Sequence, residues 1–138
     1  MAFAETFEHG TPGVSERSVE FVDAIQHGLP VTAAEDIALH LAPGDPNFRY
    51  QIVPKATLAR RKHSARLSAD EGERVVRLGR LWDRTLSIWK DADAARRFLW
   101  RPNALLSMRT PISLALAGET GGRMVETLLG QFEAGVAI

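Results

Sequence analysis

The stretch that decides the fold class is residues 68–90, which read SADEGERVVRLGRLWDRTLSIWK. Apolar side chains recur through it at the three- and four-residue intervals of one helical face. They are Val75, Leu78, Gly79, Trp82, Leu86 and Trp89. Ser68 and Glu71 have the spacing of a capping box, in which a hydroxyl and a carboxylate each satisfy a free amide of the first turn. This pattern predicts one long helix over residues 69–90.

The first helix of the chain is predicted to start after Ser15, a capping residue, and to end at Gly28. Its apolar residues at roughly helical spacing are Val19, Val22 and Ile25. Residues 1–14 contain Gly10, Pro12 and Gly13 and show no periodicity, so we expect a flexible tail there.

Three short helices are predicted between this first helix and the long one. Thr32 and Glu35 form a capping box for a helix that ends at Pro43. Asp45 and Pro46 can start a second, over residues 48–52. Pro54 then enforces a break, because proline disfavours a helical residue before it. The third helix covers residues 55–63, with Ala56, Leu58 and Ala59 as its apolar contacts.

Downstream, Asp91 caps a predicted helix over residues 92–99, and Thr110 with Pro111 caps another that runs through Leu116. The last helix is predicted over residues 122–133 and is closed by Gly135. The glycine-rich residues 118–122 are interpreted as a turn between helices, since no strand precedes them and no Lys follows. No stretch shows sustained strand alternation, so the predicted fold class is all-α.

Composition bounds the function. The 138 residues suffice for one compact domain or two small helical ones, and 45% of them are apolar. The absence of Cys excludes disulfides, thiol nucleophiles and thiolate metal sites. We find neither a signal peptide nor an apolar run near the ~18 residues that span a bilayer. A cytoplasmic protein is therefore expected.

The net charge of zero hides an asymmetry. Residues 1–54 hold two bases against eight acids, a net charge of −6. Residues 55–101 hold thirteen bases against six acids, a net charge of +7, and residues 102–138 hold two against three, a net charge of −1. This distribution suggests different partners for different parts of the chain. The alternative is that the charges are solvated faces of helices.

No constellation of catalytic residues is apparent. The four His residues stand far apart, without the spacing of a metal site. No nucleophile, base and oxyanion site assemble in the sequence. We therefore expect no enzyme activity, no cofactor and no metal.

The basic stretch of residues 54–63, PKATLARRKH, has the composition of a DNA recognition helix. It offers long cationic donors for guanine edges and phosphates, and a short hydroxyl near the helix start. The two short helices before it supply the support that a helix-turn-helix requires. The candidate DNA-binding residues are Lys55, Thr57, Arg60, Arg61 and Lys62. A solvated face is the alternative for Arg60, Arg61 and Lys62.

Residues 98–111, FLWRPNALLSMRTP, resemble the toxin-binding domain of the Xre/MbcA/ParS antitoxins. The family pattern reads approximately F-L-x-x-P-N-x-x-L-G-G-R-x-P, then T-E-x-G, and it ends in a helix with L-L-x-x-I-x-x-G. Matching positions are Phe98, Leu99, Pro102, Asn103, Leu106, Arg109, Pro111, Glu119, Gly121, Leu128, Leu129, Phe132 and Gly135. Residues 28–31 and 57–68 are similar to the family's Xre-like half, so the resemblance covers residues 19–138.

The chain departs from this pattern at several turns. Ser107 and Met108 replace the glycine pair, so we expect a turn of different shape there. Gly118 stands where Thr is usual. Val53 and Pro54 replace the glycine-containing turn between the second and third short helices, and Gln51 replaces a small apolar residue.

The resemblance implies an antitoxin whose partner is a RES-type or ParT-like toxin that consumes NAD, by degrading it or by transferring ADP-ribose. The antitoxin is expected to cover the toxin's active site and to repress its own operon. The implied toxin-binding residues are Trp100, Arg101, Asn103, Ser107, Met108, Arg109, Thr110 and Glu119. Tryptophan, methionine and arginine are types enriched at binding interfaces.

The implied organisation is an Xre-like helix-turn-helix domain at residues 15–68, a connecting helix at 69–90 and a toxin-binding domain at 91–138. A homodimer is expected, because helix-turn-helix proteins read paired half-sites. Trp82 and Trp89 are candidates for its surface, although burial within one chain explains both equally well. The alternative functions are a stand-alone transcriptional regulator whose C-terminal half dimerises, and a plain helical adaptor.

Overall fold

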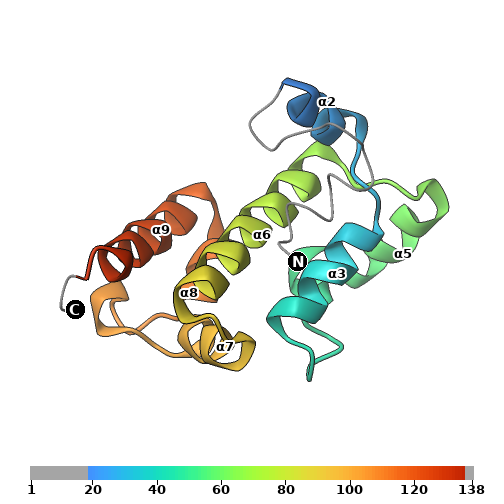
Figure 1. Cartoon of the computed structure of the whole chain (residues 1–138). Helices are drawn as coiled ribbons and strands as arrows, with labels where there is room; N and C mark the ends of the chain where they lie inside the picture. Colours follow the sequence, from blue (N-terminus) through green and yellow to red (C-terminus); the bar gives the residue numbers. More distant parts are fainter. Residues whose placement is uncertain (1–18, 136–138) are drawn as a thin grey trace. The chain divides into compact units, whose positions relative to one another are not determined.

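The computed structural model describes residues 19–135, and within them the chain is helical with no strand beyond two isolated backbone bridges (Figure 1). The all-α prediction is confirmed. The predicted tail and the Ser15 cap lie outside the described residues. The helices are α2 (Val19–His27), α3 (Thr32–Leu41), α4 (Arg49–Ile52), α5 (Lys55–Ser64), α6 (Ala69–Trp89), α7 (Ala92–Trp100), the 3-10 helix η1 (Ala104–Leu106), α8 (Pro111–Ala117) and α9 (Glu119–Glu133).

The chain divides into two compact units, one ending at Gly79 and the other starting at Arg80. Helix α6 contributes its first half to unit 1 and its second half to unit 2. Its predicted extent is confirmed to within one residue. The Ser68 capping box is also present: the Ser68 N–H donates to Glu71 Oε1 at 2.7 Å, and the Glu71 N–H donates to Ser68 Oγ at 3.2 Å.

Unit 1 packs α2 to α5 and the start of α6 around a core of aliphatic side chains and two phenylalanines. Its fully buried members include Ala34, Ile37, Leu41, Phe48, Ile52, Val53, Val75 and Leu78. On α2 the buried residues are Phe21 and Ile25, whereas Val19 and Val22 are exposed. The apolar spacing thus identified Ile25 correctly but missed Phe21.

The predicted Thr32 capping box is wrong. Val31 already has helical backbone angles, φ −56° and ψ −34°, so Thr32 lies inside the first turn and no side chain caps it. The Ala33 and Ala34 amides donate instead to the carbonyls of Pro30 and Val31, at 3.0 and 3.1 Å. Helix α4 is also shorter than predicted, because Asp45 Oδ1 accepts from the Asn47 N–H in a turn and the helix begins only at Arg49.

Unit 2 packs α7 against α8 and α8 against α9. Its helices start as predicted at two caps: Asp91 Oδ2 accepts from the Ala94 N–H at 2.8 Å, and Thr110 Oγ1 accepts from the Ser113 N–H at 3.2 Å. Helix α9, however, begins at Glu119, three residues before the predicted start at Gly122. Only Gly118 separates it from α8.

Gly121 explains why α9 can start so early. A Cβ on this residue would lie 2.1 Å from the Leu114 carbonyl oxygen of α8, closer than any two such atoms approach. The backbones of α8 and α9 therefore meet at a contact that only glycine permits. The predicted turn between helices is therefore confined to Gly118, and the glycines after it lie within α9.

The two tryptophans of α6 are packed within the chain. Trp82 is 2% exposed, and the Arg96 guanidinium lies over its ring at 5.2 Å. The Trp89 ring stacks on Phe98 with centroids 4.6 Å apart, and Phe132 meets both edge-on. Trp82 is therefore buried within the chain, whereas Trp89 is half-buried.

Candidate functional site

Helix α5 of unit 1 starts where the sequence predicts, because Pro54 has an extended backbone, φ −52° and ψ 147°, after α4 has ended. Leu58 anchors the helix in the core and is 2% exposed. The neighbouring Ala56 and Ala59 are exposed, so their predicted apolar contacts are absent. Lys55 and Arg60 are exposed as well.

The remaining candidate DNA-binding residues differ in their surroundings. Thr57 is half-buried on α5, and the Lys62 side chain lies outside the described structure. Lys55 lies near the Tyr50 ring, with its Nζ 5.6 Å from the ring centroid. For Arg60, no carboxylate partner is found within the described residues. Lys55 and Arg60 therefore present positive charge on the surface of α5.

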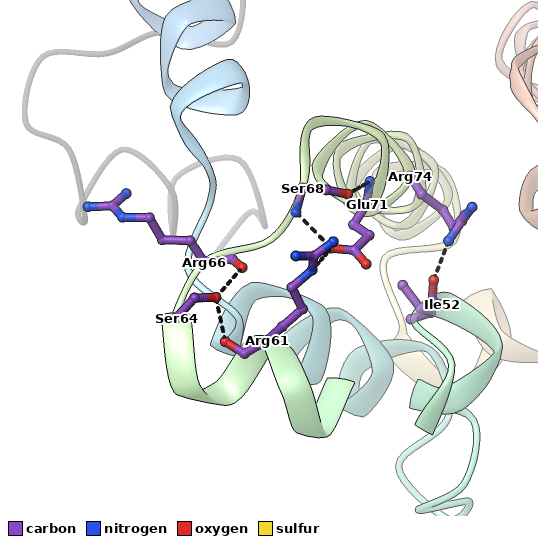
Figure 2. Close-up of polar contacts among 7 residues, drawn as sticks. All are labelled: Ile52, Arg61, Ser64, Arg66, Ser68, Glu71 and Arg74. Carbon is purple, nitrogen blue, oxygen red and sulfur yellow. Dashed lines mark hydrogen bonds and ion pairs between the residues drawn. The ribbon is translucent and has the colours of Figure 1, made fainter. Parts of the chain in front are cut away.

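Arg61 pairs with Glu71 in the first turn of α6 (Figure 2). Its Nε donates to Glu71 Oε1 at 3.0 Å, and the same oxygen accepts the Ser68 N–H. Burial by itself raises the pKa of Glu71, but the hydrogen bonds from Ser68 and the Arg61 charge outweigh it and hold the pKa below its ordinary value. One carboxylate thus caps α6 and holds α5.

Two further arginines of the positively charged region, residues 55–101, make hydrogen bonds within unit 1. Arg66 Nη1 donates to the Gly28 carbonyl at 2.9 Å. Arg74 Nη1 donates to the Ile52 carbonyl at the end of α4, and Figure 2 shows this contact near Glu71. Arg61, Arg66 and Arg74 therefore stabilise the fold. Fewer cationic side chains are available to a partner than the net charge of residues 55–101 suggests.

In unit 2, Trp100 at the end of α7 and the following residues 101–109 around η1 form a short segment, here called the 100–109 loop. The Asn103 N–H donates to the Arg109 carbonyl at 3.1 Å, and the Met108 N–H donates to the Asn103 carbonyl at 2.8 Å. Asn103 Oδ1 accepts from the Leu105 N–H at 2.9 Å, and Leu106 is buried. The loop is thus shaped by its own hydrogen bonds and anchored by one apolar side chain.

Ser107 and Met108 turn the loop back on itself. Their φ angles are 55° and 61°, and the Arg109 N–H donates to the Leu106 carbonyl at 3.1 Å. Two positive φ values between such a donor and acceptor are characteristic of a type I′ β-turn. The left-handed backbone that favours glycine is therefore present even though neither residue is a glycine.

The loop exposes three large apolar side chains. Trp100 is 38% exposed, Leu105 57% and Met108 63%. Arg101, Ser107 and Arg109 are exposed too. Leu105 was not among the residues predicted from the sequence. The signal was available, because in a three-residue turn such as η1 adjacent leucines cannot both face the core.

The other predicted toxin-binding residues have internal partners. The Asn103 and Thr110 side chains cap η1 and α8. Glu119 pairs with Arg80 Nη2 at 3.4 Å and with Arg123 Nε at 3.8 Å. Six of the eight predicted residues, Glu119 among them, are thus exposed, and the side chains of Asn103, Thr110 and Glu119 also hold elements in place.

Two further observations concern the described part of the chain alone. Residues 19–135 contain no group of three His, Cys, Asp or Glu side chains placed to hold a metal ion. None of the described helices has the length and apolar character needed to cross a membrane.

Comparison with known proteins matches both units. Residues 20–80 match the family described as the antitoxin Xre-like helix-turn-helix domain, and residues 86–135 match the antitoxin Xre/MbcA/ParS C-terminal toxin-binding domain. A protein of Yersinia enterocolitica named Antitoxin Xre is 32% identical over 133 residues, which cover 94% of this chain and 87% of that relative. The chain therefore belongs to the Xre family of antitoxins, with a helix-turn-helix domain followed by a toxin-binding domain.

Proposed function

We propose that this antitoxin neutralises a NAD-consuming toxin, of the RES or ParT type, by laying the 100–109 loop over the toxin's active site. The observation that carries the proposal is the exposure of Trp100, Leu105 and Met108 on a loop within the toxin-binding domain. Exposed apolar side chains gain free energy when a partner removes them from water. The NAD-consuming reaction follows from the family resemblance.

Each part of the loop has a distinct role in this proposal. The exposed cations Arg101 and Arg109 pair with carboxylates on the toxin, and Ser107 contributes hydrogen bonds. Asn103 and Thr110 keep the loop in shape through their caps. Because the loop is already ordered by internal hydrogen bonds, little conformational entropy is lost when it binds.

Co-expression with the toxin encoded beside this chain tests the proposal. The wild-type antitoxin should restore growth and cellular NAD, whereas Trp100→Ala combined with Arg109→Ala should do neither. Lys55→Ala with Arg60→Ala is a matched control, since both side chains are exposed on α5 in the other unit. Rescue by the loop variant as complete as that of the control would refute the role of the loop.

The helix-turn-helix domain is proposed to bind operator DNA as a homodimer and to repress the antitoxin's own operon in the cytoplasm. Exposed Lys55 and Arg60 support this role for α5, and Thr57 and Lys62 lie on the same helix. Their helix is held by the Arg61–Glu71 pair. Lys55→Ala with Arg60→Ala should abolish operator binding in a mobility-shift assay and leave the fold intact.

A stand-alone transcriptional regulator is the second candidate, favoured by the same exposed cations of α5. The two candidates differ in their need for a toxin. If the protein represses its operon and the neighbouring gene product forms no complex with it, the regulator is correct.

A further inference from the structure

Met108 combines a left-handed backbone with a long, exposed, apolar side chain. Its φ of 61° follows the φ of 55° at Ser107, so both central positions of the turn are left-handed. At such positions the Cβ of an L-residue crowds the following carbonyl, and glycine, asparagine and aspartate are favoured for that reason. A methionine here is conformationally unfavourable in the free protein.

The other left-handed residues in the described part of the chain have a simple explanation. Ala65 and Lys90 each follow the end of a helix, at α5 and α6, where a single left-handed residue commonly completes the last turn. Ser107 and Met108 are instead consecutive. Ser107 caps the end of η1 in the same way, but the end of a helix does not account for a second left-handed residue, Met108.

Backbone hydrogen bonds hold the turn in place, but the Met108 side chain itself does little within the unit to compensate for the strain. The side chain is 63% exposed, so it contributes little to the core, which the loop reaches through Leu106. Unfavourable backbone conformations of this kind persist where they serve a site. The compensation for Met108 is then to be sought in a contact with another molecule.

We propose that Met108 is a specificity-determining residue of the toxin interface, and that the strained turn holds its side chain out to enter an apolar hollow on the toxin. The inference rests on the proposed binding role of the 100–109 loop. A thioether chain is flexible and polarizable, which suits it to an irregular apolar cavity.

The neighbours of Met108 indicate the chemistry of this hollow. Leu105, which is 57% exposed, widens the apolar surface. Arg109 follows Met108 directly, and Arg101 lies at the start of the loop; both are exposed. The complementary toxin surface is an apolar hollow bordered by carboxylates.

The proposal makes opposite predictions for stability and for binding. Met108→Asn relieves the strain, because asparagine tolerates the left-handed region, and it removes the apolar chain. We expect its melting temperature to be unchanged or to rise by up to about 4 °C, and its affinity for the toxin to fall at least about tenfold. Met108→Leu keeps an apolar chain and should bind within about threefold of the wild type.

The experiment is calorimetric titration of the full-length antitoxin with a catalytically inactive form of the toxin encoded beside it, together with thermal unfolding of each variant. Leu39→Gln is the control, since Leu39 is 61% exposed on α3 in the other unit and should leave affinity unchanged. A large fall in the melting temperature of Met108→Asn would overturn the strain argument.

The binding outcomes separate this inference from the proposed function. If Met108→Asn binds like the wild type while Trp100→Ala with Arg109→Ala binds weakly, the role of Met108 is wrong and the role of the loop stands. If neither variant weakens binding, the loop does not contact the toxin and both proposals are wrong. Weak binding by both, with Met108→Leu close to the wild type, supports the inference.

Discussion

Helix α5 of unit 1 and the 100–109 loop of unit 2 are both exposed, but they differ in chemistry and in what holds them in place. Helix α5 presents the cations Lys55 and Arg60 and depends on the Arg61–Glu71 ion pair. The loop presents apolar side chains and depends on neutral hydrogen bonds and the buried Leu106. We propose that these are two separable recognition surfaces, the first of which is positioned by the Arg61–Glu71 pair.

The largest effect is expected from Gly121→Ala in unit 2. Its methyl group would overlap the Leu114 carbonyl oxygen, which belongs to the backbone and cannot rotate away. We expect a loss of about 3 kcal/mol or more in the free energy of unfolding, because α8 and α9 must move apart. Chemical denaturation measures this loss, and toxin binding should disappear with it.

Operator binding by the Gly121→Ala variant tests whether the two surfaces are independent of each other. If the two surfaces are separable, the variant should still bind operator DNA below the temperature at which unit 1 unfolds. Wild-type stability would show that the close approach of α8 and α9 has been misjudged.

The Gly121 contact is a feature of the fold that the sequence did not predict. Elements with strong local signals were predicted correctly, as with the Ser68, Asp91 and Thr110 caps and the long helix α6. The start of α9 was predicted three residues too late, because a pair of glycines is locally typical of a turn. Its reason lies in α8, a tertiary contact that periodicity does not contain.

The errors in unit 1 have the same origin. Thr32 fits a capping box locally, but Val31 is already helical. Val19 and Val22 share an apolar spacing with Ile25, yet packing selects Phe21. For the candidate sites, residue types predicted which segments are exposed. They did not predict that Arg61, Asn103 and Glu119 have internal partners, because ion pairs and loop hydrogen bonds depend on the fold.

The next effect concerns the electrostatics of α5. If Arg60 contacts a phosphate, Arg60→Ala should lower the slope of log affinity against log salt concentration by about 0.9. Arg61→Gln should leave that slope nearly unchanged and lower the stability of unit 1 instead, because Arg61 pairs with Glu71. Operator titrations at several salt concentrations measure both slopes. If the two variants changed the slope equally, Arg61 would also contact the DNA, which contradicts the role given to it here.

A smaller effect is expected on acidification. The pKa of Glu71 is lower in the folded protein than its ordinary value of 4.5, so the ionised carboxylate stabilises unit 1 above that pH. This contribution is lost as the pH falls from about 4.5 through the folded pKa. Glu71→Gln should lose about 1–2 kcal/mol at pH 7 and show a weaker dependence on acid.

Denaturation at a series of pH values tests this, with Asp70→Asn as the control because Asp70 is exposed in the same turn of α6. The backbone hydrogen bonds of the 100–109 loop involve no carboxylate. An acid dependence of Glu71→Gln equal to that of the wild type would contradict the role given to this pair.

The smallest effect is expected from Gly72→Ala, the unit 1 counterpart of Gly121→Ala. Its Cβ would lie 3.4 Å from Ile25 Cγ2 and 3.5 Å from Leu29 Cδ1, which is ordinary contact. Alanine favours the helix, so we expect a gain of about 0.5–1 kcal/mol in the free energy of unfolding. A loss of stability would mean that α6 packs more tightly on Leu29 than described.

The central claim is that toxin and operator are bound by different surfaces, and the most direct test is to measure both affinities for two double variants. Trp100→Ala with Arg109→Ala should lose toxin affinity by about 100-fold or more and keep operator affinity. Lys55→Ala with Arg60→Ala should lose operator affinity and keep toxin affinity. The account would be contradicted if the loop variant kept its toxin affinity or if the α5 variant lost it.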